Sequence, residues 1–353
     1  MSEPLYVPIL PVRQYARTAY AHLRPDIQAA MAPLWNLPPS PGVTPEGLKN
    51  AHWQRELNRV RGAHRRHPGW LDAPFAEEAQ IPALAEILAE CTGLSRLLRP
   101  VTGPERSEAQ QSAALGTAAR YGCGAGVRVR VPGEWDSRVP EAVERLLTRA
   151  GPEVTVDLLL DMGGVLPGRP DAGKEALRAL DALHALAPWR TVTVLGGGFP
   201  QVTDDLLELG ELHEEPRTDW HMWHEVRASD RHYLARLAYG DYGVQPVTAL
   251  AQEQGGGGPP PWGVLRYTTD HWFVLCKVLT RGPDRTAGIR AAAGRIRDLP
   301  EFRGATASAG ETWLRDCAEG PLTTSKGTGQ VGDWLRAGNV QHFTYAVRCL
   351  RGR

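Results

Sequence analysis

Several short apolar runs of this chain contain arginine and aspartate residues, whose side chains could bind a ligand or take part in catalysis. Arg128 and Arg130 alternate with valines in the run 126–131, and Asp161 and Asp241 lie near the ends of two later runs. Arginine can bind phosphate or carboxylate groups through two parallel hydrogen bonds. Carboxylates can hold a hard cation such as Mg²⁺ or Mn²⁺, or act as a general acid and base. Together these residue types fit a phosphorylated or nucleotide-like ligand, but they do not select a reaction.

Eight apolar runs, mostly separated by helical patterns, must position these side chains. Such alternation is typical of parallel β/α units, and eight units most naturally close into a (β/α)8, or TIM, barrel of about 250 residues. The runs cover 6–10, 32–36, 69–72, 98–102, 126–131, 154–162, 191–195 and 237–242. An open doubly wound sheet is the alternative. It is weakened because the glycine-rich turn follows the seventh run instead of the first and contains no G-x-G-x-x-G.

The alternation also predicts which side chains face the barrel interior. The outer face of each strand packs against helices and should be apolar, so the polar face should point inward. The expected interior residues are Arg128, Arg130, Asp161, Thr193, Tyr239 and Asp241, with Asp72 at the end of its strand. Buried charges need partners, so we expect Arg128 or Arg130 to pair with Asp161 or Asp241. Either a structural ion network or a polar site at the carboxyl-terminal mouth would explain these residues.

The loop after the seventh run is a further candidate for ligand binding. Gly197 and Gly198 belong to a three-glycine turn whose backbone N–H groups could cradle an anion. Loops after the seventh and eighth strands of such barrels often bind phosphate. A tight turn without a ligand is the other interpretation.

The chain after residue 250 is expected to complete the same domain. We assign 1–250 to the barrel, 251–262 to a Gly- and Pro-rich loop, and 263–353 to a hairpin and helices that pack on the barrel. The runs 263–267 and 271–279 alternate like the two strands of that hairpin. Helical patterns follow at 286–297 and 340–350.

Composition restricts the class of partner. Lys plus Arg and Asp plus Glu both number 40, so the formal net charge is zero and gives no strong nucleic-acid signal. The five cysteines are far apart, which argues against a disulfide framework or zinc ribbon. We find no apolar run long enough for a membrane helix and no signal-peptide pattern at the start. The sequence therefore predicts a cytoplasmic protein with no membrane partner.

Several short motifs, taken in order, resemble those of the Beta protein family, which is named after a protein of T-even bacteriophages. They are Tyr6–Leu10, the strand ending in Asp161, Gly198–Pro200, Tyr239–Tyr242, Arg266–Tyr267 and Gln341–His342. The resemblance covers nearly the whole chain and implies a role in conflict between phages and their hosts, without implying a reaction. It also adds weight to five site candidates: Asp161, Asp241, Tyr242, Arg266 and Tyr267.

Two functions remain open at this point. In the first, the barrel mouth binds a nucleotide-like or phosphorylated ligand. Its anion would be held by Arg128, Arg130 and Arg266, and Asp161 and Asp241 would hold a metal or transfer protons. In the second, the barrel is a non-enzymatic scaffold of an antiviral defence system. Its loop at 255–261 and nearby aromatic residues would bind a partner or phage protein.

Overall fold

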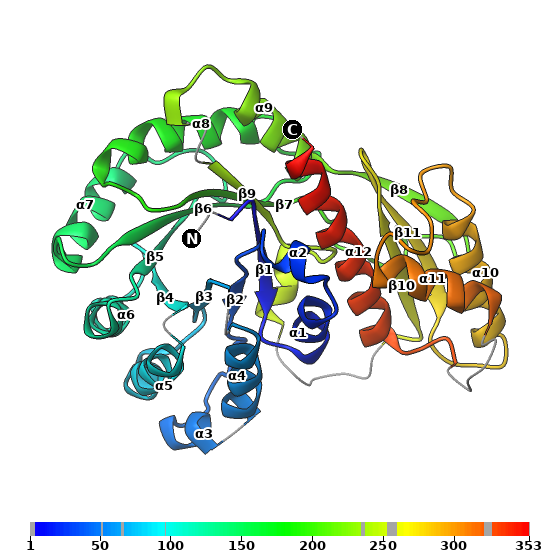
Figure 1. Cartoon of the computed structure of the whole chain (residues 1–353), viewed down its shortest axis with the longest axis horizontal. Helices are drawn as coiled ribbons and strands as arrows, with labels where there is room; N and C mark the ends of the chain where they lie inside the picture. The colour runs from blue at the N-terminus through cyan, green and yellow to red at the C-terminus, as the bar shows by residue number, and fades with distance from the viewer. Residues whose placement is uncertain are drawn as a thin grey trace.

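Eight parallel strands close into a barrel in the order β1-β2-β3-β4-β5-β6-β7-β9 (Figure 1). The computed structural model describes residues 4–50, 52–64, 67–95, 97–233, 237–252, 260–320 and 327–352. The barrel strands are β1 (Tyr6–Pro11), β2 (Leu34–Asn36), β3 (Gly69–Asp72), β4 (Leu98–Thr102), β5 (Ala125–Arg130), β6 (Val156–Gly164), β7 (Val192–Gly197) and β9 (Leu237–Asp241). The predicted (β/α)8 architecture is therefore confirmed, and every predicted run overlaps one of these strands.

Helices lie outside the strands and cover the barrel (Figure 1). They are α1 (Gln14–Ala21), α2 (Pro25–Gln28), α3 (Pro45–Asn50), α4 (His52–Ala63), α5 (Ile81–Leu94), α6 (Glu108–Tyr121), α7 (Val139–Ala150), α8 (Ala172–Leu183) and α9 (Thr218–Ala228). Short 3-10 helices are η1 (Glu78–Gln80), η2 (His184–Leu186) and η4 (Val247–Ala251). Local chemistry sets their ends. The Ser107 hydroxyl, for example, accepts a hydrogen bond from the Gln110 N–H at the start of α6.

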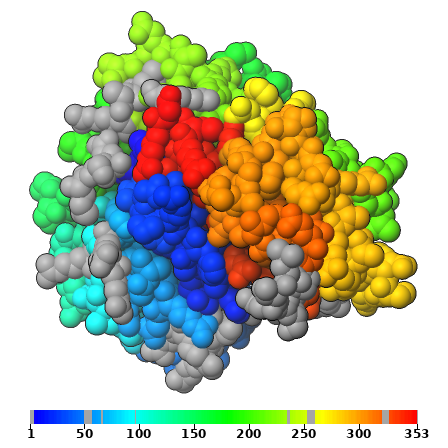
Figure 2. Space-filling model, turned by 45° about the vertical axis from the view of Figure 1, so that its right-hand side comes forward, coloured from blue at the N-terminus to red at the C-terminus, as the bar shows by residue number. Residues whose placement is uncertain are grey.

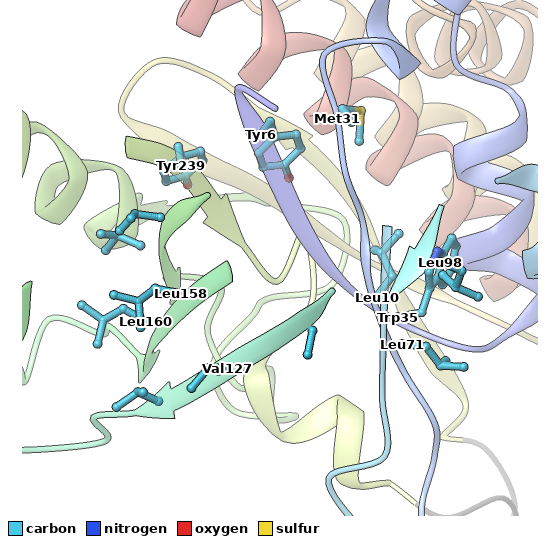
Figure 3. Packing of buried hydrophobic residues seen from close by; sticks show 14 of the residues in the cluster. Tyr6, Leu10, Met31, Trp35, Leu71, Leu98, Val127, Leu158, Leu160 and Tyr239 are labelled. Carbon is cyan, nitrogen blue, oxygen red and sulfur yellow. The ribbon is translucent and has the colours of Figure 1, made fainter. Parts of the chain in front are cut away.

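The side chains of the barrel strands pack into two separate hydrophobic cores, one outside the barrel and one inside it. Between strands and helices lies a cluster that includes Tyr6, Leu10, Trp35, Val127, Leu158, Leu160 and Tyr239 (Figure 3). Inside the barrel lies another, which includes Val7, Ile9, Leu34, Trp70, Val101, Leu159, Leu195 and Ala238. Neighbouring residues along one strand belong to different cores because strand side chains alternate. The valines of β5 face the helices, as predicted, so Arg128 faces inward.

A three-stranded antiparallel sheet stands beside the barrel (Figure 1). The predicted hairpin is confirmed as β10 (Trp262–Thr268) and β11 (Trp272–Leu279). The third strand, β8 (Leu212–Pro216), pairs with β11 and was not predicted. Its sequence, Leu-His-Glu-Glu-Pro, lacks the apolar alternation of a strand because it lies at a partly exposed sheet edge.

Three further helices complete the second part of the molecule. They are α10 (Arg285–Arg297), α11 (Ala309–Glu319) and α12 (Val331–Arg351). Helices α10 and α11 share a core with one face of the sheet. Helix α12 contacts α1, α11 and β10, and Figure 2 shows it in red beside the blue amino-terminal segment. It begins nine residues before the predicted helix at 340, so it is long enough to join the sheet to the barrel.

Within the described residues, no helix combines the length and the apolar character that a bilayer crossing requires.

Candidate functional site

A buried polar layer occupies the interior near the carboxyl ends of the strands, with Arg128 of β5 at its centre. Its Nη1 donates to Asn36 Oδ1 and to Asp72 Oδ2, both at 2.7 Å. Its Nε and Nη2 donate to Asp161 Oδ2 at 3.0 and 2.7 Å. Asn36 and Asp72 end β2 and β3, and Asp161 lies in β6. The predicted pairing of Arg128 with Asp161 is therefore confirmed, and one guanidinium connects four strands.

Tyr242, directly after β9, closes this layer from the opposite side. Its hydroxyl lies 2.7 and 2.9 Å from the two carboxylate oxygens of Asp161, and the Gly163 N–H donates to Asp161 Oδ1 at 2.9 Å. Burial alone would raise the pKa of Asp161. The Arg128 charge and these hydrogen bonds outweigh burial and hold that pKa below its usual value. Asp161 is therefore an ionised group with its acceptor sites in use.

Asp72 retains one free acceptor. Its Oδ2 receives Arg128 and, at 3.5 Å, Arg106 Nη2, whereas its buried Oδ1 has no hydrogen-bond partner among the described residues. Arg106 also donates to the backbone oxygen of Pro74 at 2.8 Å, which fixes the loop after β3. Arg128 and Arg106 thus balance the charge of the two aspartates.

A pocket of about 210 Å³ lies over this layer. Its lining combines polar residues of the strand ends with apolar residues of the following loops: Asn36, Pro74, Phe75, Arg128, Arg130, Tyr242, Val247, Thr248, Leu250 and Ala251. We call it the mouth pocket. Arg130, the last residue of β5, is exposed, and no described carboxylate forms an ion pair with it. The pocket therefore has an ion-paired floor and one unneutralised cation at its edge.

Gly197, the last residue of β7, and Gly198 after it both lie in close contact with neighbouring side chains. A Cβ on Gly197 would lie 2.5 Å from Val247 Cγ2 and 3.0 Å from Tyr242 Cδ2, so this glycine lets two pocket residues approach β7. A Cβ on Gly198 would lie 2.1 Å from Asp219 Oδ1, outside the pocket lining. The anion cradle proposed for these two glycines remains a prediction.

Tyr239 and Asp241 face the helices, so their predicted interior placement is wrong. Tyr239 belongs to the outer core and stacks on Tyr6 at a centroid distance of 5.7 Å (Figure 3). The alternation on β9 is opposite to the expected one because the small residues Ala238 and Gly240 face inward. A Cβ on Gly240 would lie 2.2 Å from Leu195 Cδ2 of the interior core. The large ring of Tyr239 finds space only against the helices.

Asp241 instead joins the barrel to the second part of the molecule. It accepts hydrogen bonds from Tyr6 Oη at 2.6 Å and from the Gly243 N–H, and its Oδ2 lies 2.8 Å from His342 Nε2 of α12. Burial raises the pKa of Asp241, but His342 and these hydrogen bonds outweigh burial and lower it. His342 Nδ1 in turn lies 2.9 Å from Thr268 Oγ1 of β10. The geometry gives Asp241 a docking contact, away from the mouth pocket.

Arg266 and Tyr267 lie in β10, and neither lines the mouth pocket. Tyr267 points toward Phe302 and Arg303, and its hydroxyl accepts from the Arg303 N–H at 3.2 Å. Arg266 lies over the Phe199 ring at 5.4 Å and donates to the backbone oxygen of Val264. The structure therefore brings together Asp72, Arg128, Arg130, Asp161 and Tyr242, and separates them from Asp241, Arg266 and Tyr267.

A second interior network fills the amino-terminal end of the barrel. Asp157 of β6 accepts hydrogen bonds from Trp70 Nε1 at 2.9 Å, Arg99 Nη1 at 3.2 Å and Arg190 Nη2 at 2.6 Å. Three donors therefore converge on one buried carboxylate, so this layer has the features of a structural ion network. Thr193 is also buried, as expected for an interior residue.

No group of three or more His, Cys, Asp or Glu side chains is placed to hold a metal ion in the part of the chain that the structure describes. A cation between Asp72 and Asp161 would meet the guanidinium of Arg128, which is bound to both. The aspartates at the mouth are therefore better suited to orient an arginine than to bind Mg²⁺ or Mn²⁺.

Sequence reasoning missed several residues that line the pocket or bind the polar layer beneath it. Asn36 ends its strand as Asp72 does, and this shared position was the available signal. Phe75 and Arg106 follow β3 and β4 within a few residues, in the loops from which barrel sites are built. The lining residues of η4 carry no local sequence signal because that wall consists of three apolar residues and one threonine.

Comparison with models of protein families identifies the family of this chain. The model of the Beta protein family matches residues 6–348, which is nearly the whole chain. A search of curated proteins found no match. The motifs that resembled this family, from Tyr6 to His342, all lie within the matched range. The chain, a closed (β/α)8-like barrel with an added antiparallel sheet, belongs to the Beta protein family.

Proposed function

We propose that the chain binds a small anionic, ring-bearing ligand in the mouth pocket, of the nucleotide-like or phosphorylated kind. The observation that carries this proposal is the contrast between two arginines of β5. Arg128 is 3% exposed and bound to two aspartates, whereas Arg130 is exposed and has no carboxylate partner among the described residues. Arg130 is therefore free to bind an anion at the edge where barrel enzymes and binding proteins place their sites.

The pocket walls support a ligand that also has an apolar or aromatic part. Phe75 lies in the loop after β3, Val247 and Leu250 lie in η4, and all three line the pocket. An aromatic side chain can stack on a flat ring, while Asn36 and Thr248 offer polar atoms. A volume of about 210 Å³ suits one ring or sugar better than an extended chain. Binding is the function proposed, because Asp161 is already saturated with hydrogen bonds.

The biological setting that the family resemblance implies, conflict between phages and their hosts, forms part of this proposal. The alternative scaffold function depended on the loop at 255–261, of which residues 255–259 lie outside the described part of the structure. Of the aromatic residues near it, Trp262 lies over Lys277 and Trp272 is 39% exposed. The mouth pocket has the more specific chemistry, so the ligand-binding function is preferred.

A thermal-shift and calorimetry screen tests the proposal. The panel contains nucleoside monophosphates, nucleosides, sugar phosphates and inorganic phosphate, each with the wild type, Arg130→Gln and Phe75→Ala. Loss of one charge-assisted contact should weaken binding of a phosphorylated ligand about 10- to 100-fold in Arg130→Gln. Phe75→Ala should weaken nucleotides about 5- to 10-fold and leave sugar phosphates nearly unchanged.

Arg281→Gln is the matched control, since Arg281 is exposed but does not line the pocket. It should bind every compound as the wild type does. If no member of the panel stabilises the wild type, or if Arg130→Gln retains full affinity for the ligand that does, the proposed function is wrong.

A further inference from the structure

The walls of the mouth pocket differ in how firmly they are attached to the barrel. Its lining residues on β2 and β5 belong to strands that are hydrogen-bonded within the closed sheet. Its wall from the loop after β3 is fixed through the backbone. Arg106 Nη1 donates to the Pro74 backbone oxygen at 2.8 Å, and Gln110 Nε2 donates to the Ala73 backbone oxygen at 2.8 Å. Neither wall can move without loss of these hydrogen bonds.

The wall formed by η4 is attached differently. This 3-10 helix, Val247–Ala251, supplies four of the ten residues that line the pocket. No backbone–backbone hydrogen bond joins residues 245–252 to another described element. Leu250 anchors η4 through its apolar side chain, which is 7% exposed and belongs to the interior core. A segment held mainly by side chains opens at a lower cost in free energy than one within a hydrogen-bonded sheet.

Two residues at the start of α1 hold both ends of this segment from outside the pocket. At its amino-terminal end, the Tyr15 hydroxyl donates to Gln245 Oε1 at 2.6 Å. At its carboxyl-terminal end, the backbone oxygen of Gln252 accepts a hydrogen bond from Arg13 Nη2. Arg13 directly precedes α1 and Tyr15 lies in its first turn, and neither residue lines the pocket. One end of a helix therefore fastens the wall without occupying the space in which a ligand would bind.

The size of the pocket indicates that this wall has to move. Its volume is about 210 Å³, whereas pockets for small organic ligands typically measure about 300–1,000 Å³. One ring or sugar fits the observed space, but a complete nucleotide needs more. Val247 of η4 lies so close to β7 that a Cβ on Gly197 would be 2.5 Å from its Cγ2. Displacement of η4 from β7 would enlarge the pocket while the strands and the loop after β3 keep their hydrogen bonds.

We propose that η4 is a movable wall of the mouth pocket, which moves away from β7 to admit and release a ligand of nucleotide size, and that Arg13 and Tyr15 control how readily it opens. The kind of ligand rests on the function proposed for the pocket, whereas the opening of η4 is a property of the chain alone. Arg13 and Tyr15 are positioning residues. Their loss should change how fast a ligand exchanges and not how tightly it binds, because it favours the open wall equally in the empty and the occupied pocket.

Thiol labelling measures the opening of η4 without a ligand. Leu250→Cys places a thiol that is buried while the wall is closed, and its reaction with a chromogenic disulfide reagent reports the opening. Addition of Tyr15→Phe or Arg13→Gln removes one hydrogen bond at one end of the segment, so the labelling rate should rise about 3- to 10-fold in each. Tyr233→Phe is the matched control and should leave the rate unchanged. It removes a hydroxyl that donates to Asp181 at 2.7 Å, away from the pocket lining.

Two native cysteines separate local opening from unfolding of the whole barrel. Cys91 and Cys123 are buried in the core between strands and helices, so their thiols become accessible through unfolding. Mass spectrometry of the labelled peptides assigns a rate to each cysteine. The proposal is wrong if Tyr15→Phe and Arg13→Gln do not accelerate labelling at position 250, or if they accelerate labelling of the two native cysteines by the same factor.

Adenosine monophosphate is the probe for ligand exchange, measured by stopped flow in proteins that keep Leu250. In Tyr15→Phe, the association and dissociation rate constants should both rise by the factor seen in thiol labelling, and the dissociation constant should stay nearly unchanged. A weaker affinity with an unchanged association rate would show that Tyr15 shapes the closed pocket, and the movable wall would be wrong. If the wild type binds no compound of the panel, the function proposed for the pocket is wrong, whereas the labelling rates still decide whether η4 opens.

Discussion

Arg128 and Asp161 meet through a single oxygen: Nε and Nη2 of the guanidinium both donate to Oδ2 of the carboxylate, at 3.0 and 2.7 Å. The other carboxylate oxygen is left for the Tyr242 hydroxyl and the Gly163 N–H. This division lets one aspartate of β6 bind Arg128 of β5 and Tyr242, the residue after β9, at the same time.

Asp161→Asn should therefore destabilise the protein strongly. It removes the charge that balances a buried guanidinium, and breaking such a pair from one side costs about 3–5 kcal/mol. Urea unfolding measures this change. The exposed pair Asp136–Arg138 provides the control, and Asp136→Asn should leave the unfolding curve nearly unchanged. An Asp161→Asn protein as stable as the wild type would show that Arg128 does not need this partner.

The buried environment of His64 predicts that the protein loses stability in mild acid. Its Nε2 accepts from Trp35 Nε1 at 2.7 Å, and its Nδ1 lies 3.0 Å from the His67 backbone oxygen. Because an indole N–H can only donate, the ring must be neutral. Burial lowers the pKa of His64 to about 4. The unfolded chain, with a histidine pKa of about 6.5, therefore binds the proton first, and stability is full above that pH and falls between pH 6.5 and 4.

Urea unfolding between pH 7 and 4.5 checks this sign. The contribution of one such histidine approaches about 1.4 kcal/mol per pH unit within that window. His64→Gln can still accept from Trp35, and it should flatten the pH dependence. His22→Gln, at an exposed position, should keep the wild-type slope. An unchanged slope in His64→Gln would contradict the assignment.

Asp241→Asn tests the docking role of that residue. The change weakens the contact with His342 and the hydrogen bond from Tyr6, so we expect a loss of about 1–3 kcal/mol in unfolding free energy. Ligand affinity of the folded protein should not change, because Asp241 does not line the mouth pocket. A large loss of ligand affinity in a variant of normal stability would show that Asp241 belongs to the ligand-binding site.

Gly197→Ala should alter the mouth pocket without unfolding the barrel. The new methyl group would meet Val247 and Tyr242, so η4 must move away from β7. We expect weaker binding of the ligand identified by the screen, and a stability loss of about 1–3 kcal/mol from overpacking. Gly210→Ala is not a suitable comparison because its backbone has φ +80°. Gly116→Ala in α6, where a Cβ meets no atom within 4 Å, is the control and should bind normally.

The barrel was predictable because alternation and strand spacing are local properties of the sequence. The inward placement of Arg128 followed from the valines beside it. Tyr239 and Asp241 could not be placed in the same way, because the face that they occupy depends on how Gly240 fits against Leu195 of β7. Strand β8 was missed because an edge strand needs no apolar face. The alternation of each strand narrowed the partners of Arg128 to a few acidic residues. The contact of Asn36 with Arg128 and the lining residues from η4 could not be predicted, because closure of the barrel brings them to the site.

The Asp157 network has a consequence for how a ligand would enter and leave the mouth pocket. Trp70, Arg99 and Arg190 converge on Asp157 at the amino-terminal end of the interior, and the apolar cluster that includes Leu159 lies between them and Arg128. If the mouth pocket binds a ligand as proposed, this filled interior closes the far end of the barrel, and the ligand would have to leave through the mouth by which it entered. One ligand could then replace another only after the first had dissociated, so the residence time of the first would limit the rate of exchange.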